Sequence, residues 1–115
     1  MNFEITKLDR RHSYWEYYSY MIEFRKSEGS LNKTHAGVLE FDRVRRWFNE
    51  TYSWSQDIET RQEMLRVMDA QQIHDLDNIN THWAYSIKYQ EYRIYVNESA
   101  LTMFKLKWSN DSNNR

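Results

Sequence analysis

The fold is decided by one stretch, residues 82–108, which reads HWAYSIKYQEYRIYVNESALTMFKLKW. Large apolar side chains occupy every second position in three runs: Trp83, Tyr85, Ile87 and Tyr89, then Tyr92, Ile94 and Val96, and finally Phe104, Leu106 and Trp108. This period of two is typical of strands that bury one face. Residues 97–99 can turn the chain between the last two runs, because asparagine tolerates left-handed backbone angles. The stretch therefore predicts a three-stranded antiparallel meander with one apolar face and one polar face.

Two helices are predicted before this meander, where the spacing of apolar residues changes from two to three and four. The first helix is indicated by Val38, Phe41, Val44, Phe48 and Tyr52. It begins at Val38 or has Asp42 as its N-cap. The second helix is expected to begin near residue 55, because residues 53–56 fit the capping-box pattern and acidic residues follow. We expect it to end near Ile73.

The N-terminal region predicts one or two further strands. Phe3–Lys7 alternates apolar and polar residues, and it is expected to form a short strand. Tyr14–Phe24 fits both the helical and the strand period. We favour a strand because its residues are mostly Tyr, Trp, Phe and Ile. In that case Tyr17 and Met21, on the side opposite its other rings, indicate a strand covered on both faces.

The order of these elements predicts an α+β fold. Two helices would be inserted between the N-terminal strands and the meander and would pack on one face of an antiparallel sheet. A chain of 115 residues fits one domain, which we expect to span residues 1–108. Residues 109–115 are polar and predict a flexible tail.

Composition limits the classes of function. The chain has a net charge of -1, so no overall field attracts nucleic acid or an anionic membrane. Its mean hydropathy is -0.99, and no apolar run is long enough to span a membrane. The first residues lack the basic and apolar blocks of a signal peptide, and there is no cysteine. We therefore expect an intracellular, cytoplasmic protein without membrane partners.

Motifs for catalysis or metal binding are weak in this sequence. The residues that lie closest to a metal-ligand pattern are His74, Asp75, Asp77 and His82. Their spacing matches no HExxH or comparable ligand set. No serine stands in a GxSxG motif, and the two glycines do not form a phosphate-binding loop. The sequence predicts neither an enzyme nor a bound metal or cofactor.

Basic residues interleaved with aromatic residues suggest one kind of binding. They are Arg43, Arg45 and Arg46 on the first helix, and Lys88, Arg93, Lys105 and Lys107 on the polar face of the meander. If Tyr95 also points to that face, the group could stack bases and contact the phosphates of single-stranded RNA or DNA. A simpler reading is that these cations keep the strands soluble. Nucleic-acid binding is therefore the alternative hypothesis.

The aromatic content favours another kind of binding. The chain holds 5 Trp, 9 Tyr and 5 Phe, more rings than a single small core readily covers. Trp47, Tyr52 and Trp54 lie where the two helices meet, and we predict them as a protein interface, although they could equally cap the core. The first hypothesis is thus a small interaction domain that self-associates as a homodimer or binds another protein.

Overall fold

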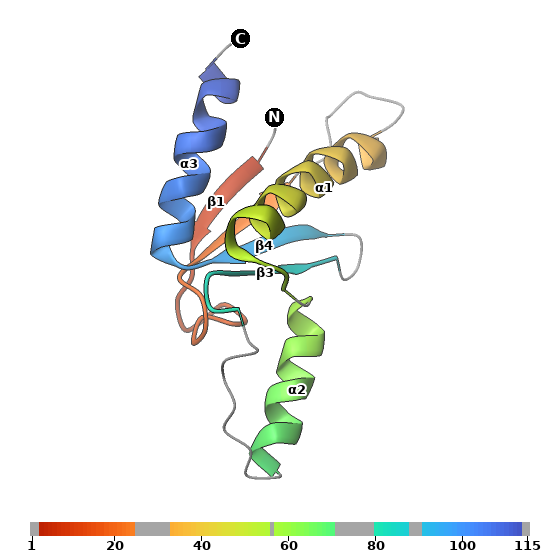
Figure 1. Cartoon of the computed structure of the whole chain (residues 1–115), viewed down its shortest axis with the longest axis vertical. Helices are drawn as coiled ribbons and strands as arrows, with labels where there is room; N and C mark the ends of the chain where they lie inside the picture. Colours follow the sequence, from red (N-terminus) through yellow and green to blue (C-terminus); the bar gives the residue numbers. More distant parts are fainter. Residues whose placement is uncertain (1–2, 25–32, 56, 71–79, 88–90, 114–115) are drawn as a thin grey trace.

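The computed structural model describes residues 3–24, 33–55, 57–70, 80–87 and 91–113 (Figure 1). In chain order its elements are β1 (Phe3–Lys7), β2 (Tyr20–Phe24), α1 (Lys33–Tyr52), α2 (Ile58–Ala70), β3 (Trp83–Ser86), β4 (Tyr92–Val96) and α3 (Glu98–Asn113). The strands form one sheet in the order β1-β2-β4-β3, and every pairing is antiparallel. The predicted α+β class with an antiparallel sheet is confirmed.

The main core lies between the sheet and two helices, α1 and α3 (Figure 1). Apolar residues at alternate strand positions supply the sheet side: Ile22, Phe24, Trp83, Ile94 and Val96. Residues at helical spacing supply the other side: Phe41, Val44 and Phe48 from α1, and Ala100, Leu101, Phe104 and Trp108 from α3. The change of period that the sequence shows therefore corresponds to two layers that share one core.

The predicted third strand of the meander is wrong, because α3 occupies its place. Asn97 caps this helix: its side-chain Oδ1 accepts a hydrogen bond of 2.8 Å from the Ala100 N–H. Glu98 then lies in the first turn, where a negative charge is favourable. The alternation of Phe104 and Leu106 is coincidental, since Phe104 is fully buried and Leu106 is exposed. The helix continues to Asn113, into the segment predicted as a tail.

The second face of the sheet is also covered. This differs from the polar face predicted for the meander, and it agrees with the prediction from Met21 that the strand near residue 21 is covered on both faces. Its buried cluster consists of Leu8, Tyr18, Ile58, Ala84 and Tyr95, with Tyr14 and Met21 packed against them. The segment between β1 and β2 folds over this face, and a hydrogen bond of 2.8 Å from the Leu8 N–H to the Ser19 carbonyl closes it. Of the predicted strand at 14–24, only residues 20–24 are extended. Tyr14 has a φ of 68°, which starts a turn instead.

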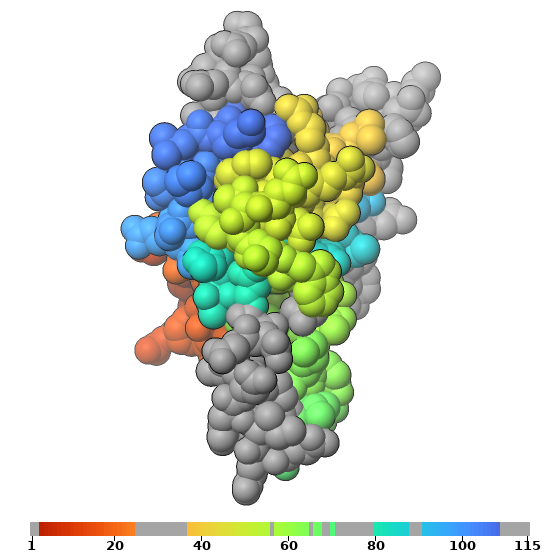
Figure 2. Space-filling view, viewed as in Figure 1, coloured from red at the N-terminus to blue at the C-terminus, as the bar shows by residue number. Residues whose placement is uncertain are grey.

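Helix α2 projects away from the sheet, unlike the predicted pair of helices on one face (Figure 1). Its N-cap is Asp57, whose Oδ1 accepts a hydrogen bond of 2.9 Å from the Thr60 N–H. The first turn joins the body through buried Ile58 and through a 2.8 Å hydrogen bond from the Ser86 hydroxyl to Glu59. The space beside α1 is filled by α3, whose atoms lie directly against it (Figure 2). Within the described ranges, no helix has the length and apolar character needed to cross a bilayer.

Candidate protein-interaction site

The end of α1 places a tryptophan on the surface. Tyr52 is the last residue of the helix, and Ser53 follows with a φ of 74°, in the left-handed region that often ends helices. This region is unfavourable for serine, so surrounding contacts must hold it there. Trp54 comes next, and its side chain is 67% exposed. The sharp turn at Ser53 directs the chain toward α2 and leaves Trp54 outside the core.

The backbone around Trp54 is fixed by side chains from the segment that leads into β3. The Asn80 amide donates hydrogen bonds to the Tyr52 carbonyl at 2.8 Å and to the Ser53 carbonyl at 3.2 Å. The Trp83 indole N–H also donates to the Ser53 carbonyl, at 2.9 Å. In return, the Ser55 hydroxyl donates to the Trp83 carbonyl at 2.9 Å. These bonds hold the connection between α1 and α2 against the start of β3.

Other rings surround this fixed segment. The Tyr52 ring stacks on the ring of His82, with centroids 4.8 Å apart and planes 20° apart. His82 is exposed, whereas Trp83 beside it is only 1% exposed and stacks on Phe48. We call Tyr52, Trp54 and His82 the aromatic corner. It combines a rigid backbone with rings that remain accessible to a partner.

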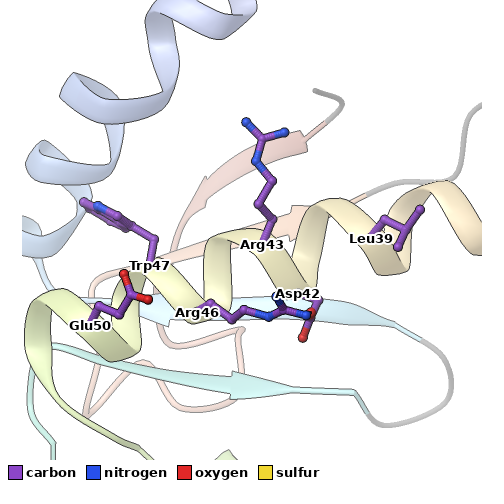
Figure 3. A pocket seen from close by; sticks show the side chains of 6 residues that line it. All are labelled: Leu39, Asp42, Arg43, Arg46, Trp47 and Glu50. Atoms are coloured by element: carbon purple, nitrogen blue, oxygen red, sulfur yellow. The ribbon is translucent and has the colours of Figure 1, made fainter.

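A pocket of about 430 Å³ lies on the outer side of α1 (Figure 3). Its lining residues are Leu39, Asp42, Arg43, Arg46, Trp47 and Glu50. The half-buried Trp47 ring contacts Tyr52 edge-on at 6.4 Å and Trp108 of α3 at 6.3 Å, so it links the pocket to the aromatic corner. Hydrogen bonds from Arg45 and Arg46 hold the pKa of Asp42 below its ordinary value. The pocket thus combines the Trp47 ring with the ion pair between Asp42 and Arg46.

The structure separates the three predicted interface residues by exposure. Trp54 is the exposed member, while Trp47 and Tyr52 are half-buried. Tyr52 keeps one face against Phe48 in the core, at a ring distance of 6.1 Å. Trp47 and Tyr52 therefore pack against the core, which is the second of the two roles considered from the sequence, while Trp54 is left exposed.

The described residues predicted for nucleic-acid binding are divided between the two sides of the sheet. Arg43 and Lys107 lie over the Trp108 ring at 4.9 and 5.6 Å, on the side of α1 and α3. Arg93 lies on the opposite side of the sheet with Tyr95, which is 3% exposed.

Three arginines of that group form ion pairs. The Arg93 guanidinium forms ion pairs with Glu23 at 2.7 Å and with Glu91 at 2.8 Å. Arg45 and Arg46 pair with Asp42, and Lys105 is exposed on α3. Lys88 lies outside the described residues.

A buried arginine is the feature that the sequence did not reveal. Arg61 is 6% exposed, and its guanidinium donates a hydrogen bond to the Tyr18 hydroxyl and lies 4.8 Å from the centre of that ring. Burial lowers the pKa of Arg61 and raises the pKa of Tyr18 to about 12. The only sequence signal is the spacing of three from Ile58, which places Arg61 on the inner side of α2.

Metal ligands do not converge in the part of the chain that the structure describes: no three His, Asp or Glu side chains there could hold an ion together. His74, Asp75 and Asp77, the nearest approach to a ligand pattern in the sequence, lie outside the described residues. Comparison of the chain with protein-family models, curated proteins and solved structures finds no match.

Proposed function

We propose that this chain is a self-associating protein-interaction domain that binds a partner protein at the aromatic corner. The observation that carries the proposal is the exposed Trp54 side chain on a backbone held by hydrogen bonds from Asn80 and Trp83. Tryptophan and tyrosine are the residues that most often dominate the energy of protein interfaces. An exposed tryptophan on a fixed backbone also loses little conformational freedom on binding.

The surroundings of Trp54 support the same proposal. A typical interface has an apolar centre and a polar rim. The aromatic corner supplies the rings, and the pocket around Trp47 supplies charged groups of both signs, among them Arg46 and Glu50. A partner that places an apolar side chain against Trp54 and polar groups over the pocket would match both parts. We do not extend the proposal to nucleic acid, because Tyr95 is buried and Arg93 is paired.

Site-specific photo-crosslinking tests this proposal in cells that produce the protein. A benzophenone amino acid replaces Trp54 in one variant and Trp15, an exposed residue of the segment between β1 and β2, in a matched control. We expect a discrete adduct with another protein from position 54 and not from position 15. Adding Asn80→Ala to the position-54 variant should lower the adduct yield several-fold, because the backbone loses its support.

Two outcomes contradict the proposal. Equal adducts from both positions would mean that the contacts of Trp54 are unspecific. The absence of any discrete adduct from position 54, in cells where the variant is folded, would mean that this corner binds no protein.

A further inference from the structure

The two edges of the sheet are built differently. On the β3 edge, the residue before α2 approaches the strand, and Asp57 forms a parallel bridge with Tyr85. The strand is also short, with only four residues. On the β1 edge, no described segment pairs with the outer side of the strand. Edge strands with unpaired backbone groups readily accept another strand, so the β1 edge is the candidate for docking.

The backbone groups that face this edge follow from the register. The Leu8 N–H donates to the Ser19 carbonyl, and hydrogen-bonded positions alternate along an antiparallel pair. Glu4 and Thr6 therefore direct their N–H and C=O groups to β2. Phe3, Ile5 and Lys7 direct theirs to the open side. The five residues pair one-to-one with Tyr20–Phe24, so no bulge distorts the edge.

Helix α3 lies alongside this edge (Figure 1) and adds apolar surface. Phe104 of α3 contacts Phe3 of β1, with ring centroids 5.1 Å apart, while Trp108 faces α1. Met103 and Leu106 lie about 140° and 160° around the helix from Trp108, hence on the side away from α1. They are 43% and 66% exposed. An occupant of the β1 edge on this side would cover both.

We propose that the occupant is a second copy of this chain, which pairs its own β1 antiparallel to the first. A two-fold axis through Ile5 satisfies the outward backbone groups of both strands, because it pairs Ile5 with Ile5 and Phe3 with Lys7. Glu4 then lies opposite Thr6 of the other copy. If the two-fold axis passed through Glu4 instead, Glu4 would lie opposite Glu4 of the other copy. Like charges at directly opposite positions are unfavourable. The strand is thus complementary to itself.

The same two-fold axis accounts for the exposed residues of α3. When two sheets join edge to edge in this way, the helices that cover them lie on the same side of the joined sheet. The two α3 helices would approach each other across the axis, and Met103 and Leu106 of both copies would become covered. Covering these apolar side chains adds a hydrophobic contribution to the free energy of dimer formation. A pair of short strands alone lacks this contribution.

This dimer rests on the proposed function and extends it. The aromatic corner lies beside β3, and β3 and β1 are opposite edges of the sheet. A dimer through β1 would therefore carry two free aromatic corners, one at each end. Two linked sites can bind a multivalent partner far more strongly than one.

Amide exchange measured at low and high protein concentration tests the dimer without any substitution. The Glu4 and Thr6 amides should be protected at both concentrations, because they bond to β2. The Ile5 and Lys7 amides should exchange at least about tenfold more slowly at the high concentration, where the second strand covers them. Equal exchange of Ile5 and Lys7 at both concentrations, in samples that sediment as monomers throughout, would overturn the inference.

Variants give an independent readout by analytical ultracentrifugation. M103E/L106E should weaken the dimer at least about tenfold, since it places four carboxylates at the axis. Trp54→Ala should leave the dimer unchanged. Both residues of the double variant are exposed in the monomer, so its fold should persist, as circular dichroism would verify.

A dimer that survives M103E/L106E, or one that Trp54→Ala removes, would contradict the β1 interface. Adducts from position 54 would still appear in that case if the proposed function is correct, so the two proposals fail separately.

Discussion

Replacing Trp83 with alanine is expected to lower the free energy of unfolding by about 3–5 kcal/mol. The side chain is 1% exposed and stacks on Phe48 at 5.5 Å, so its removal leaves a large cavity in the main core. It also removes the indole N–H that binds the Ser53 carbonyl. A loss of this size is a large fraction of the roughly 5–15 kcal/mol by which a domain is stable. Chemical denaturation followed by circular dichroism measures it.

Two further substitutions make this result interpretable. Trp15→Ala removes the same side chain from an exposed position, so it should change the free energy of unfolding by no more than about 0.5 kcal/mol. Trp83→Phe keeps a ring in the core but removes the N–H, so it should cost less than Trp83→Ala. Equal stabilities of Trp83→Ala and Trp15→Ala would show that Trp83 is not a core residue.

Stability is expected to fall by about 2–3 kcal/mol between about pH 10 and pH 12 because of Tyr18. Burial raises the pKa of this hydroxyl from 10.0 to about 12 in the folded protein, and the charge of Arg61 opposes the rise. Above pH 10 the unfolded chain loses the Tyr18 proton while the folded chain keeps it. The contribution of Tyr18 to the free energy of unfolding is therefore complete below about pH 10. It is lost as the pH rises through the folded-state pKa of Tyr18.

Urea denaturation at a series of alkaline pH values measures this fall, and Tyr18→Phe identifies its source. The variant should be less stable at neutral pH, because the Arg61 guanidinium loses its hydrogen-bond acceptor. Its stability should nevertheless depend less steeply on pH than that of the natural sequence. A residual slope is expected, since burial also raises the pKa of Tyr14 and Tyr95. Identical slopes in the two proteins would contradict the burial of the Tyr18 hydroxyl.

Local patterns were sufficient to predict β1, β4 and the existence of α1, because each has a clear apolar period. The start of α1 was wrong: the helix begins at Lys33, before the predicted Val38, and the predicted N-cap Asp42 lies within it.

Local patterns were not sufficient for α3. Phe104, Leu106 and Trp108 alternate like a strand, while Ala100, Leu101, Phe104 and Trp108 are spaced like a helix. Both patterns share Phe104 and Trp108, so periodicity alone could not decide between them. The informative signals are Asn97 and the acidic residue after it, which cap a helix here but are equally compatible with the predicted turn between strands.

The covered second face of the sheet depends on contacts between distant parts of the chain. The Tyr18 hydroxyl, for example, lies 3.3 Å from the backbone carbonyl of Trp83, which is 65 residues away in sequence. The local sequence of a strand does not distinguish a tyrosine that a loop covers from one that is exposed among basic residues. The sequence therefore predicts Tyr95 as a candidate for base stacking, whereas in the structure Leu8 and Tyr14 pack against it.

The candidate site was predictable as a region but not in detail. The junction of two helices with Trp47, Tyr52 and Trp54 could be recognised from sequence. Which ring remains exposed depends on the left-handed turn at Ser53 and on Asn80, which lies 27 residues farther along the chain. No short-range sequence pattern indicates the contact between Asn80 and Ser53, so the exposure of Trp54 could not be predicted from the sequence.

Fluorine NMR of protein labelled with fluorotryptophan tests the central claim most directly, because the chain has 5 tryptophans that report separately. The shift of each resonance between light and heavy water measures its exposure to solvent. We expect the largest shift for Trp54, a smaller one for Trp47 and almost none for Trp83. A Trp54 resonance as insensitive to solvent as that of Trp83 in the isolated protein would contradict an exposed aromatic corner, and with it the proposed binding site.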